Sequence, residues 1–340
     1  MPKQAEPGEP IEVAGHTIVV SNPGKVFFPE RGETKLDLVR YYLAVGEPLL
    51  RAMGGRPVLL QRFPNGAAGP SFFQKRVPDN APEWLTTAIV ETPNGTTANA
   101  LVVADLAHVV WAVNLGCLGF HVWPYHADDP AHVDELRIDL DPTPGVVFEQ
   151  VREAAHHTHA LLDELGMVGR PKTTGNRGIH IYVRLQRRWD AYQVRSAAVA
   201  LARELARRHP ALVTDAWWKE ERGTRVFVDF NQNAPHKTMF GAWSVRARVG
   251  AQVSTPFSWD ELDGVHPDAF IMATVPERVR ALGDLWVPDD DRAQSLEPLL
   301  ARHERDRAGG LMDAPWPPVY PKMPDEPPRV APSRARKADG

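Results

Sequence analysis

The chain has 340 residues, of which 43% are hydrophobic and 24% are charged, and its formal net charge is −4. This is ordinary globular composition, and the length allows about two domains. No run approaches the ~18 apolar residues of a membrane span, and the start of the chain lacks a signal-peptide apolar region, so we expect no membrane association. The only cysteine, Cys117, excludes an intramolecular disulfide and a cysteine-based zinc site. It indicates a reducing, cytoplasmic location.

The charges are distributed unevenly along the chain. Residues 170–250 hold sixteen Lys and Arg residues but only six Asp and Glu residues, so the rest of the chain is acidic. A basic block inside an acidic chain is typical of a nucleic-acid-binding surface. Solvated helix faces account for part of it, because Arg203, Arg207 and Arg208 lie on a predicted amphipathic helix at 190–209.

The first half of the chain alternates between strand and helix patterns. Residues 11–20 predict a strand or short hairpin, and residues 35–53 predict a helix that ends at Gly54–Gly55. Asn94–Gly95 predicts a hairpin turn. The further strands are predicted at 56–63, 71–76, 86–92, 96–104, 120–125 and 136–141, and the further helices at 105–118 and 146–166.

The second half continues with a glycine-containing loop and then mixed elements. Strands are predicted at 179–185 and 225–230, a helix at 190–209, and a strand or hairpin region at 237–256. Ser258 and Glu261 form a capping box for a short helix. The pattern predicts a mixed α/β (α+β) fold with largely antiparallel sheets flanked by helices. From residue 313 onward eight of 28 residues are Pro, which predicts an extended, mobile tail ending in RARKADG.

Two acids stand one residue apart in the strand-like run LRIDLDP (136–142). Because strand side chains alternate, Asp139 and Asp141 point to the same face as Arg137. Adjacent carboxylates repel each other unless a cation or a shared proton lies between them. This strand is therefore the first candidate for a functional site.

Two further stretches carry polar groups at strand ends. In KTTGNRGIHIYV (172–183), Thr174, Arg177 and His180 supply donors around a loop whose amides can approach an anion. A glycine-containing turn without a ligand is the alternative. In RVFVDFNQN (225–233), Asp229 follows an apolar strand, and a solvated acid at the sheet edge is the alternative there.

Taken together, three carboxylates suit a pair of divalent metals, which take oxygen ligands. Two metals can activate an attacking hydroxyl and stabilise the leaving oxygen of a phosphoryl transfer. A nucleoside triphosphate also requires cations, and the chain offers His180, Arg222, Lys237, Arg246 and Arg248. A nuclease has less use for so many donors, so the pattern favours polymerase-type transfer over hydrolysis.

The ordered motifs IDLDP, TTGNRGIHIY, VFVDFNQN and SVRARVGAQVSTPFSWDEL resemble the archaeo-eukaryotic primase superfamily. More specifically, the chain resembles the polymerase domain of bacterial ligase D and its stand-alone relatives, the primase-polymerases that work beside ligase C. NPGKVFFPERGETK, RPVLLQRFPNG, SFFQKR and HVWPYH belong to the same resemblance. It implies a primase-polymerase catalytic domain over about residues 1–285, followed by a C-terminal helical segment and Pro-rich tail at 286–340 that have no counterpart.

The resemblance implies catalytic, metal-binding roles for Asp139, Asp141 and Asp229, with two Mn²⁺ or Mg²⁺ ions and an NTP or dNTP substrate. It places His121, Thr174, His180 and Arg246 near the phosphates and sugar of the nucleotide, with Arg222 and Gln232 close by; Arg177 of the loop is added to this nucleotide-binding set. Related enzymes favour ribonucleotides, so a contact to the 2′-hydroxyl is expected near His121.

The resemblance also implies two DNA-binding sites. Asn22, Lys25 and Lys35 match a site for the 5′-phosphate on the far side of a gap, although the lysines alone would read as surface residues. Phe72 and Phe73 match an aromatic pair that stacks on the template base, although alternation predicts that at least one is buried. Arg62 and Lys75 are added as contacts to backbone phosphates or the nucleotide.

The resemblance thus implies a template-dependent nucleotidyltransferase that fills short gaps during excision or end-joining repair. The expected partners are gapped or broken double-stranded DNA with a 5′-phosphate, an ATP-dependent DNA ligase in trans because no K-x-D-G ligase signature is attached, and an end-binding protein. Thr174 stands where a serine is common, which keeps the hydroxyl. A metal-dependent phosphoesterase or nuclease, and a non-catalytic end-binding module, are the alternatives.

Overall fold

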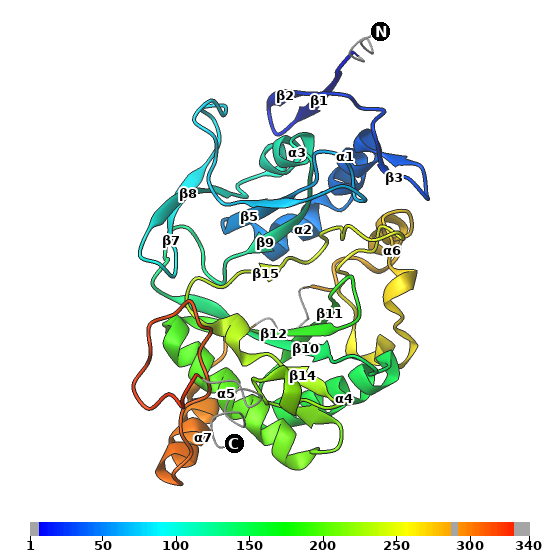
Figure 1. Cartoon of the computed structure of the whole chain (residues 1–340). Helices are drawn as coiled ribbons and strands as arrows, with labels where there is room; N and C mark the ends of the chain where they lie inside the picture. The colour runs from blue at the N-terminus through cyan, green and yellow to red at the C-terminus, as the bar shows by residue number, and fades with distance from the viewer. Residues whose placement is uncertain (1–6, 287–291, 330–340) are drawn as a thin grey trace, which may run out of the picture.

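Two β-sheets, each with its own hydrophobic core, form the body of the protein (Figure 1). The computed structural model describes residues 7–286 and 292–329. Most of the first sheet lies in the blue and cyan part of Figure 1, with one short strand in the yellow part, and the second sheet lies in the green part. The predicted mixed α/β fold with largely antiparallel sheets flanked by helices is confirmed. Within the described ranges no helix has the length and apolar character needed to cross a membrane.

The described chain begins with two small hairpins. The first confirms the prediction at 11–20 and consists of β1 (Glu9–Val13) and β2 (His16–Val20). The second pairs β3 (Val26–Phe28) with β4 (Glu33–Thr34).

The helix predicted at 35–53 is divided into two helices. These are α1 (Lys35–Ala44), which Thr34 caps together with Asp37, and α2 (Gly46–Met53). Pro48 explains the break, because proline has no amide proton to donate to the carbonyl oxygen of Ala44 at i−4, and its ring clashes with that carbonyl group. Val45 therefore serves as the cap between the two helices.

The first sheet has the order β15-β9-β5-β8-β7, with β6 paired to β5. Its strands are β5 (Pro57–Arg62), β6 (Phe72–Gln74), β7 (Thr87–Glu91), β8 (Thr97–Val102), β9 (Cys117–Val122) and β15 (Met239–Phe240). The predicted turn at Asn94–Gly95 joins β7 to β8, and Gly95 has the positive φ of +75° that the turn requires. Helix α3 (Leu106–Asn114) begins at the N-cap Asp105.

The second sheet has the order β11-β12-β10-β14-β13. Its strands are β10 (Val133–Pro142), β11 (Gly169–Thr173), β12 (Ile179–Trp189), β13 (Val213–Thr214) and β14 (Val226–Val228). Only the β13–β14 pair is parallel among the described pairs of this sheet. Helices α4 (Phe148–Glu164) and α5 (Ala191–Arg208) carry apolar residues of the same core as Ile138, Leu140 and Ile181.

The opposite, polar face of the second sheet is directed toward the first sheet. Arg137 donates to the carbonyl oxygens of Val122 and Trp123 at 2.8 and 3.1 Å, and Tyr182 belongs to the hydrophobic core of the first sheet. Both Arg137 and Tyr182 are buried. The alternation of β10 therefore directs apolar residues toward α4 and α5, and polar residues toward the boundary between the two sheets.

The segment after β14 contains little regular structure. The predicted strand 225–230 is shorter, because Asp229 ends it and caps the 3₁₀ helix η2 (Phe230–Asn233). The region 237–256 was predicted as a strand or hairpin. It contains the short strand β15, and the rest of it forms isolated bridges such as Val245–Val253. The other short helices are η1 (Lys219–Glu221), η3 (Trp259–Gly264), η4 (Pro267–Ala269) and α6 (Val275–Leu282), and the capping box of Ser258 and Glu261 opens η3 as predicted.

The C-terminal segment packs on the body of the protein. Helix α7 (Glu297–Ala308) contributes Leu299 to the second core, and Trp316 and Tyr320 of the following extended segment are buried. The tail is extended as predicted, but residues 313–329 are held by hydrogen bonds to α5 and η2. The basic end RARKADG (334–340) lies outside the described residues.

Candidate active site

Four polar side chains lie in one row across the second sheet. In the strand register Lys172 of β11 is opposite His180 of β12, and His180 is opposite Asp139 of β10. The amide of Asp229, directly after β14, donates to the carbonyl oxygen of Asp139 at 3.0 Å. Asp139 and Asp229 are therefore cross-strand neighbours, as are Asp139 and His180. Asp141 is two residues further along β10 and on the same face.

Burial and mutual repulsion shape the protonation of these acids. Burial raises the pKa of Asp139 to about 6, although the charges of Lys172 and Arg246 act in the opposite direction. Burial, followed by the charge of Asp139, raises the pKa of Asp229 to about 6. Burial and the charge of Asp139 also raise the pKa of Asp141. The charge of Asp139 thus acts on both of the other carboxyls.

A divalent metal such as Mg²⁺ or Mn²⁺ requires oxygen ligands that lie close together. Within the described ranges, no three His, Cys, Asp or Glu side chains lie close enough to enclose one ion. Two neighbouring buried carboxyls with raised pKa values nevertheless suit Mg²⁺ or Mn²⁺, because such ions take one or two protein carboxylates and complete their shell with water and substrate phosphates. The residues present fit the metal, and the role of Asp139, Asp141 and Asp229 as its ligands stays a prediction.

The loop after β11 is a tight, well-bonded turn. The hydroxyl of Thr174 accepts hydrogen bonds from the amides of Asn176 and Gly178 at 3.1 and 3.2 Å. Arg246 donates to the carbonyl oxygen of Thr174 at 2.9 Å. Gly175 has a φ of +68°, and a Cβ there would lie 2.9 Å from the Arg246 side chain. The glycine lets the loop approach Arg246 closely.

A buried lysine supports His180 from behind. Lys172 Nζ lies 2.8 Å from Nδ1 of His180, 2.9 Å from the carbonyl oxygen of Phe240 and 2.6 Å from Oγ of Ser254. Burial lowers the pKa of Lys172 itself well below its usual range. With the lysine as the donor to Nδ1, the imidazole carries its proton on Nε2, which lies 3.4 Å from Oδ1 of Asp139. Burial and the charge of Lys172 hold the pKa of His180 well below its usual range, so the ring is neutral.

His121 of β9 stands where the two sheets meet. Its ring makes edge contacts with Phe73 and Phe240, with centroid distances of 5.1 and 5.2 Å. Its Nε2 atom is buried without a hydrogen-bond partner. Burial, helped by the charge of Arg246, lowers the pKa of His121 to about 3, so the imidazole is neutral. A buried polar atom without a partner is a position that a ligand could satisfy.

The other residues predicted to bind the nucleotide either lie beside the acids or make hydrogen bonds to the backbone of the fold. Gln232 donates to Oδ2 of Asp229 at 3.0 Å. Arg222 donates to the carbonyl oxygens of Ala216 and Trp217 and stacks over Phe227, 3.5 Å from the ring centroid. The charges of Arg222 and Arg177 act against the rise in the pKa of Asp141 that burial and the charge of Asp139 cause. Both guanidinium groups therefore act electrostatically on the acidic face.

The three predicted 5′-phosphate residues are close together. The amide of Lys25 donates to the carbonyl oxygen of Asn22, and the amide of Lys35 donates to that of Lys25. Burial, followed by the charge of Lys25, lowers the pKa of Lys35 to about 8. Lys35 Nζ bonds the carbonyl oxygen and Oδ1 of Asn114 at 2.9 and 3.2 Å, as well as Oγ of Ser21. Two neighbouring ammonium groups favour an anion between them.

Phe72 and Phe73 are both exposed, by 47% and 55%, so the expectation that alternation buries at least one of them is wrong. They lie on β6, a strand of only three residues that pairs with β5 outside the main strand order of the first sheet. Arg62 lies under Phe72 at 5.1 Å from the ring centroid and donates to Gln74 and to the carbonyl oxygen of Leu115. Arg62 thus positions Phe72, and Lys75 is half-buried beside it.

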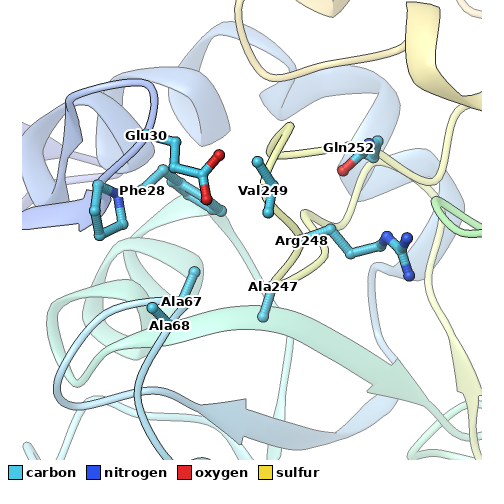
Figure 2. Close-up of a pocket in the computed structure, with 9 residues that line it drawn as sticks. Phe28, Glu30, Ala67, Ala68, Ala247, Arg248, Val249 and Gln252 are labelled. Atoms are coloured by element: carbon cyan, nitrogen blue, oxygen red, sulfur yellow. The ribbon is translucent and has the colours of Figure 1, made fainter.

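A cavity of about 400 Å³ opens next to the loop of Thr174 (Figure 2). Arg248, which lines it, donates to Oδ1 of Asn176 at 2.7 Å. Figure 2 shows the segment with Glu30 on one side of the cavity and the segment with Arg248 and Val249 on the other. The cavity is lined by Phe28, Pro29, Glu30, Ala67, Ala68, Ala247, Arg248, Val249 and Gln252, rather than by the three acids.

Sequence reasoning missed Lys172 and Asn114. Lys172 precedes the glycine-containing loop, and β11 was not predicted because Pro171 and two basic residues mask its alternation. Asn114 holds Lys35, Ser21 and the carbonyl oxygen of Val19 from the end of α3. The sequence marks Asn114 only as a polar residue at the end of an apolar helix, which does not indicate that it binds Lys35.

Comparison with known proteins gives consistent matches. Residues 34–286 match the family described as LigD, primase-polymerase domain. The chain is 33% identical over 312 residues to the multifunctional non-homologous end joining DNA repair protein LigD of Mycobacterium tuberculosis, covering 89% of this chain and 41% of that protein. It is 32% identical over 282 residues to LigD of Mycolicibacterium smegmatis, covering 82% of this chain and 37% of that protein.

A solved structure gives the same result at the level of the fold. The polymerase domain of ligase D from Mycobacterium tuberculosis in complex with DNA superposes with a TM-score of 0.75 at 32% identity, covering 84% of this chain and 98% of that domain. The chain spans about two fifths of the curated relatives it matches. The chain therefore belongs to the LigD primase-polymerase domain family and is accordingly a DNA-directed nucleotidyltransferase.

Proposed function

We propose that this chain adds nucleotides, preferentially ribonucleotides, to a 3′-hydroxyl at short gaps or broken ends that carry a 5′-phosphate. The observation that carries the proposal is the cross-strand pair of Asp139 and Asp229. This pair lies beside the loop of Thr174, to which the cationic side chain of Arg246 is hydrogen-bonded. Family membership supports nucleotidyl transfer, and the end-joining relatives support a role in DNA repair.

Asp139, Asp141 and Asp229 would hold the divalent ions. When bound, such ions activate the primer hydroxyl and neutralise the triphosphate charge that develops during in-line transfer. Asp229 is positioned for this role, because the Asn231 amide and the Gln232 side chain both donate to its carboxyl at 3.0 Å. Its raised pKa supports acceptance of the proton of the primer hydroxyl.

The nucleotide would lie between the loop after β11 and β9. Arg246, His180 and the hydroxyl of Thr174 would contact its phosphates, because they converge on the side of Asp139. The unpartnered Nε2 atom of His121 would bond the ribose 2′-hydroxyl. That bond explains a preference for ribonucleotides, since a deoxyribose leaves the buried nitrogen without a partner.

The DNA would be bound at two sites. Lys25, Lys35 and Asn22 would bind the 5′-phosphate across the gap by charge-assisted hydrogen bonds. The exposed Phe72 and Phe73 would stack on unpaired template bases. The DNA complex of the matching ligase D domain supports such a substrate, and an ATP-dependent ligase acting in trans would seal the product.

Labelled gapped DNA with Mn²⁺, with and without NTP, tests the proposal against a nuclease. We expect the primer to lengthen only when nucleotide is present and more efficiently with a 5′-phosphate. Shortening of the strand without nucleotide would show that the same acids support hydrolysis. A non-catalytic end-binding module would bind the DNA through Lys25 and Lys35 without incorporating nucleotide.

A further inference from the structure

The extended C-terminal segment reaches the face of the protein that carries Phe72 and Phe73. In Figure 1 the red loop leaves α7 and runs beside α5 toward the hairpin of β7 and β8. There Val319 shares a cavity of about 720 Å³ with β6 and with the turn between β7 and β8. The cavity is lined by Phe72, Phe73, Gln74, Lys75, Arg76, Thr92, Pro93, Asn94, Thr96, Thr97, Ala98 and Val319.

The segment is anchored next to the acidic site. Arg195 of α5 donates to the carbonyl oxygens of Ala314 and Pro315 and to the side chain of Asn231. Asn231 in turn donates to Pro315 at 2.9 Å. The amide of Asn231 also donates to the carboxyl of Asp229. The tail is therefore bound to the same short helix, η2, that positions the acid.

The tip of the segment is closed by its own hydrogen bonds. Glu326 accepts from the amides of Trp316 and Met323 and pairs with Arg329, which closes residues 316–329 into a loop. Trp316 is buried under Arg195, 3.8 Å from the guanidinium carbon, and Tyr320 donates to the carbonyl oxygen of Pro235.

Val319 is 67% exposed on this loop, one residue before the buried Tyr320. A loop closed by internal hydrogen bonds that presents an apolar side chain into a cavity provides contact surface at a lower ordering cost on binding.

The charged side chains that line the cavity indicate what kind of ligand it favours. Lys75 and Arg76 are cationic, and no acidic residue occurs among the described residues that line it. Two exposed aromatic rings and polar Thr, Asn and Gln side chains complete the lining. Aromatic faces beside cations suit the stacked bases and phosphates of a single-stranded nucleic acid.

We propose that residues 313–329 form the second wall of a groove for the unpaired template strand, with Val319 contacting its bases or sugars opposite Phe72 and Phe73. The proposal rests on the proposed function for its substrate. It assigns a role to a segment beyond the family match, which ends at residue 286. The tail thereby becomes part of the template-binding surface instead of an appendage.

The test uses the full chain with Val319→Asp, Val319→Lys and the matched control Leu311→Asp. Leu311 is 52% exposed on the same C-terminal segment but lines a different cavity. Fluorescence anisotropy would compare a duplex with a gap of several template nucleotides against a nicked duplex without unpaired template, over a series of salt concentrations. Near phosphates, Asp should weaken binding to the gapped duplex about fivefold, whereas Lys should strengthen it and increase the salt slope by roughly one.

Equal binding of the gapped duplex by wild type, Val319→Asp and Val319→Lys would overturn the inference, as would the same change with the nicked duplex or with Leu311→Asp. Primer extension by the wild type is measured on the same DNA. If it fails while the Val319 effects remain, the proposed polymerase activity is wrong but the template groove stands. If extension succeeds and the Val319 effects are missing, only the groove is wrong.

Discussion

Asp139 and Asp229 face each other across the second sheet, joined by a hydrogen bond of 3.0 Å from the amide of Asp229 to the carbonyl oxygen of Asp139. Because directly opposed residues project to the same side, the backbone itself sets the two carboxyls side by side. Each has a pKa raised to about 6, mainly by burial, and the charge of Asp139 contributes to the shift at Asp229. The fold thus maintains two acids that disfavour each other's ionisation.

The metal-free protein should lose stability as the pH rises through 6. A carboxyl whose pKa is raised in the folded state stabilises the fold fully below its unfolded pKa near 4, and this contribution is lost above the folded pKa of about 6. With a chelator, Asp139→Asn should therefore exceed the wild type in free energy of unfolding by about 3 kcal/mol at pH 7.5, and by nearly nothing at pH 4. Urea unfolding at both pH values measures this difference.

The exposed Asp260→Asn serves as the control, and its stability should follow the wild type at both pH values. Adding Mn²⁺ at pH 7.5 should stabilise the wild type more than Asp139→Asn, because an ion that binds only the folded state shifts the equilibrium toward it. A pH-independent difference between wild type and Asp139→Asn would contradict the electrostatic explanation.

Lys172→Met should weaken nucleotide use without unfolding the protein. The substitution keeps the length of the side chain but removes the donor to Nδ1 of His180, so the imidazole is no longer held toward Asp139. Because removal of a buried cation offsets part of the lost hydrogen bonding, the loss of stability should be small. We expect the nucleotide KM to rise about tenfold, which corresponds to a loss of roughly 1.4 kcal/mol in the free energy of nucleotide binding.

Steady-state primer extension over a range of NTP concentrations measures this effect. The affinity for gapped DNA should not change, and the exposed Lys322→Met should behave as the wild type. A nucleotide KM equal to that of the wild type would show that His180 needs no support from Lys172.

Lys35→Met should remove much of the preference for a 5′-phosphate. Charge-assisted hydrogen bonds contribute about 1.5–3 kcal/mol, which corresponds to a loss of roughly ten- to a hundredfold in the ratio of affinities for phosphorylated and unphosphorylated gaps. Since the pKa of Lys35 is lowered to about 8, the wild-type ratio should also fall between pH 7 and pH 9 as the ammonium loses its proton. Anisotropy titrations with the two DNAs measure both effects.

The matched control is Arg40→Met, a more exposed cation on the same helix, α1. It should lower the affinity for both DNAs equally, if at all. An unchanged preference for the 5′-phosphate in Lys35→Met would move the phosphate site elsewhere.

Phe72→Ala and Phe73→Ala should weaken binding to gapped DNA but leave the fold intact, because both rings are about half exposed. Base–aromatic stacking is worth ~1–3 kcal/mol per base, so each substitution should lower the affinity roughly five- to a hundredfold. The exposed Ile89→Ala on β7 provides a control. Equal losses with a nicked duplex would exclude stacking on unpaired template bases.

Much of the fold was predictable because periodicity reports which face of an element is buried. The hairpin of β1 and β2, the turn at Asn94–Gly95 and the shared face of Asp139 and Asp141 follow from alternation and turn chemistry alone. The break before Pro48 within the predicted helix 35–53 was missed because the apolar spacing continues through both helices.

The parts of the site that were missed depend on contacts between distant segments. Asn114 and Lys35 are 79 positions apart, and Lys172 and Ser254 are 82 positions apart, so no local pattern connects them. The exposure of both phenylalanines followed from the place of β6 in the sheet, which its sequence does not encode. Prolines in the tail predicted extension but not the anchoring by Arg195.

The most direct test of the paired acids is a primer-extension cycle with Asp139→Asn, Asp229→Asn and the double variant, on gapped DNA with Mn²⁺ and NTP. If the two carboxyls act as one unit, each single change should lower the rate about a thousandfold, and the double variant should lose little more. Circular dichroism should show that all three proteins are folded. Rates near that of the wild type in either single variant, or independent multiplicative losses, would contradict a shared catalytic role for Asp139 and Asp229.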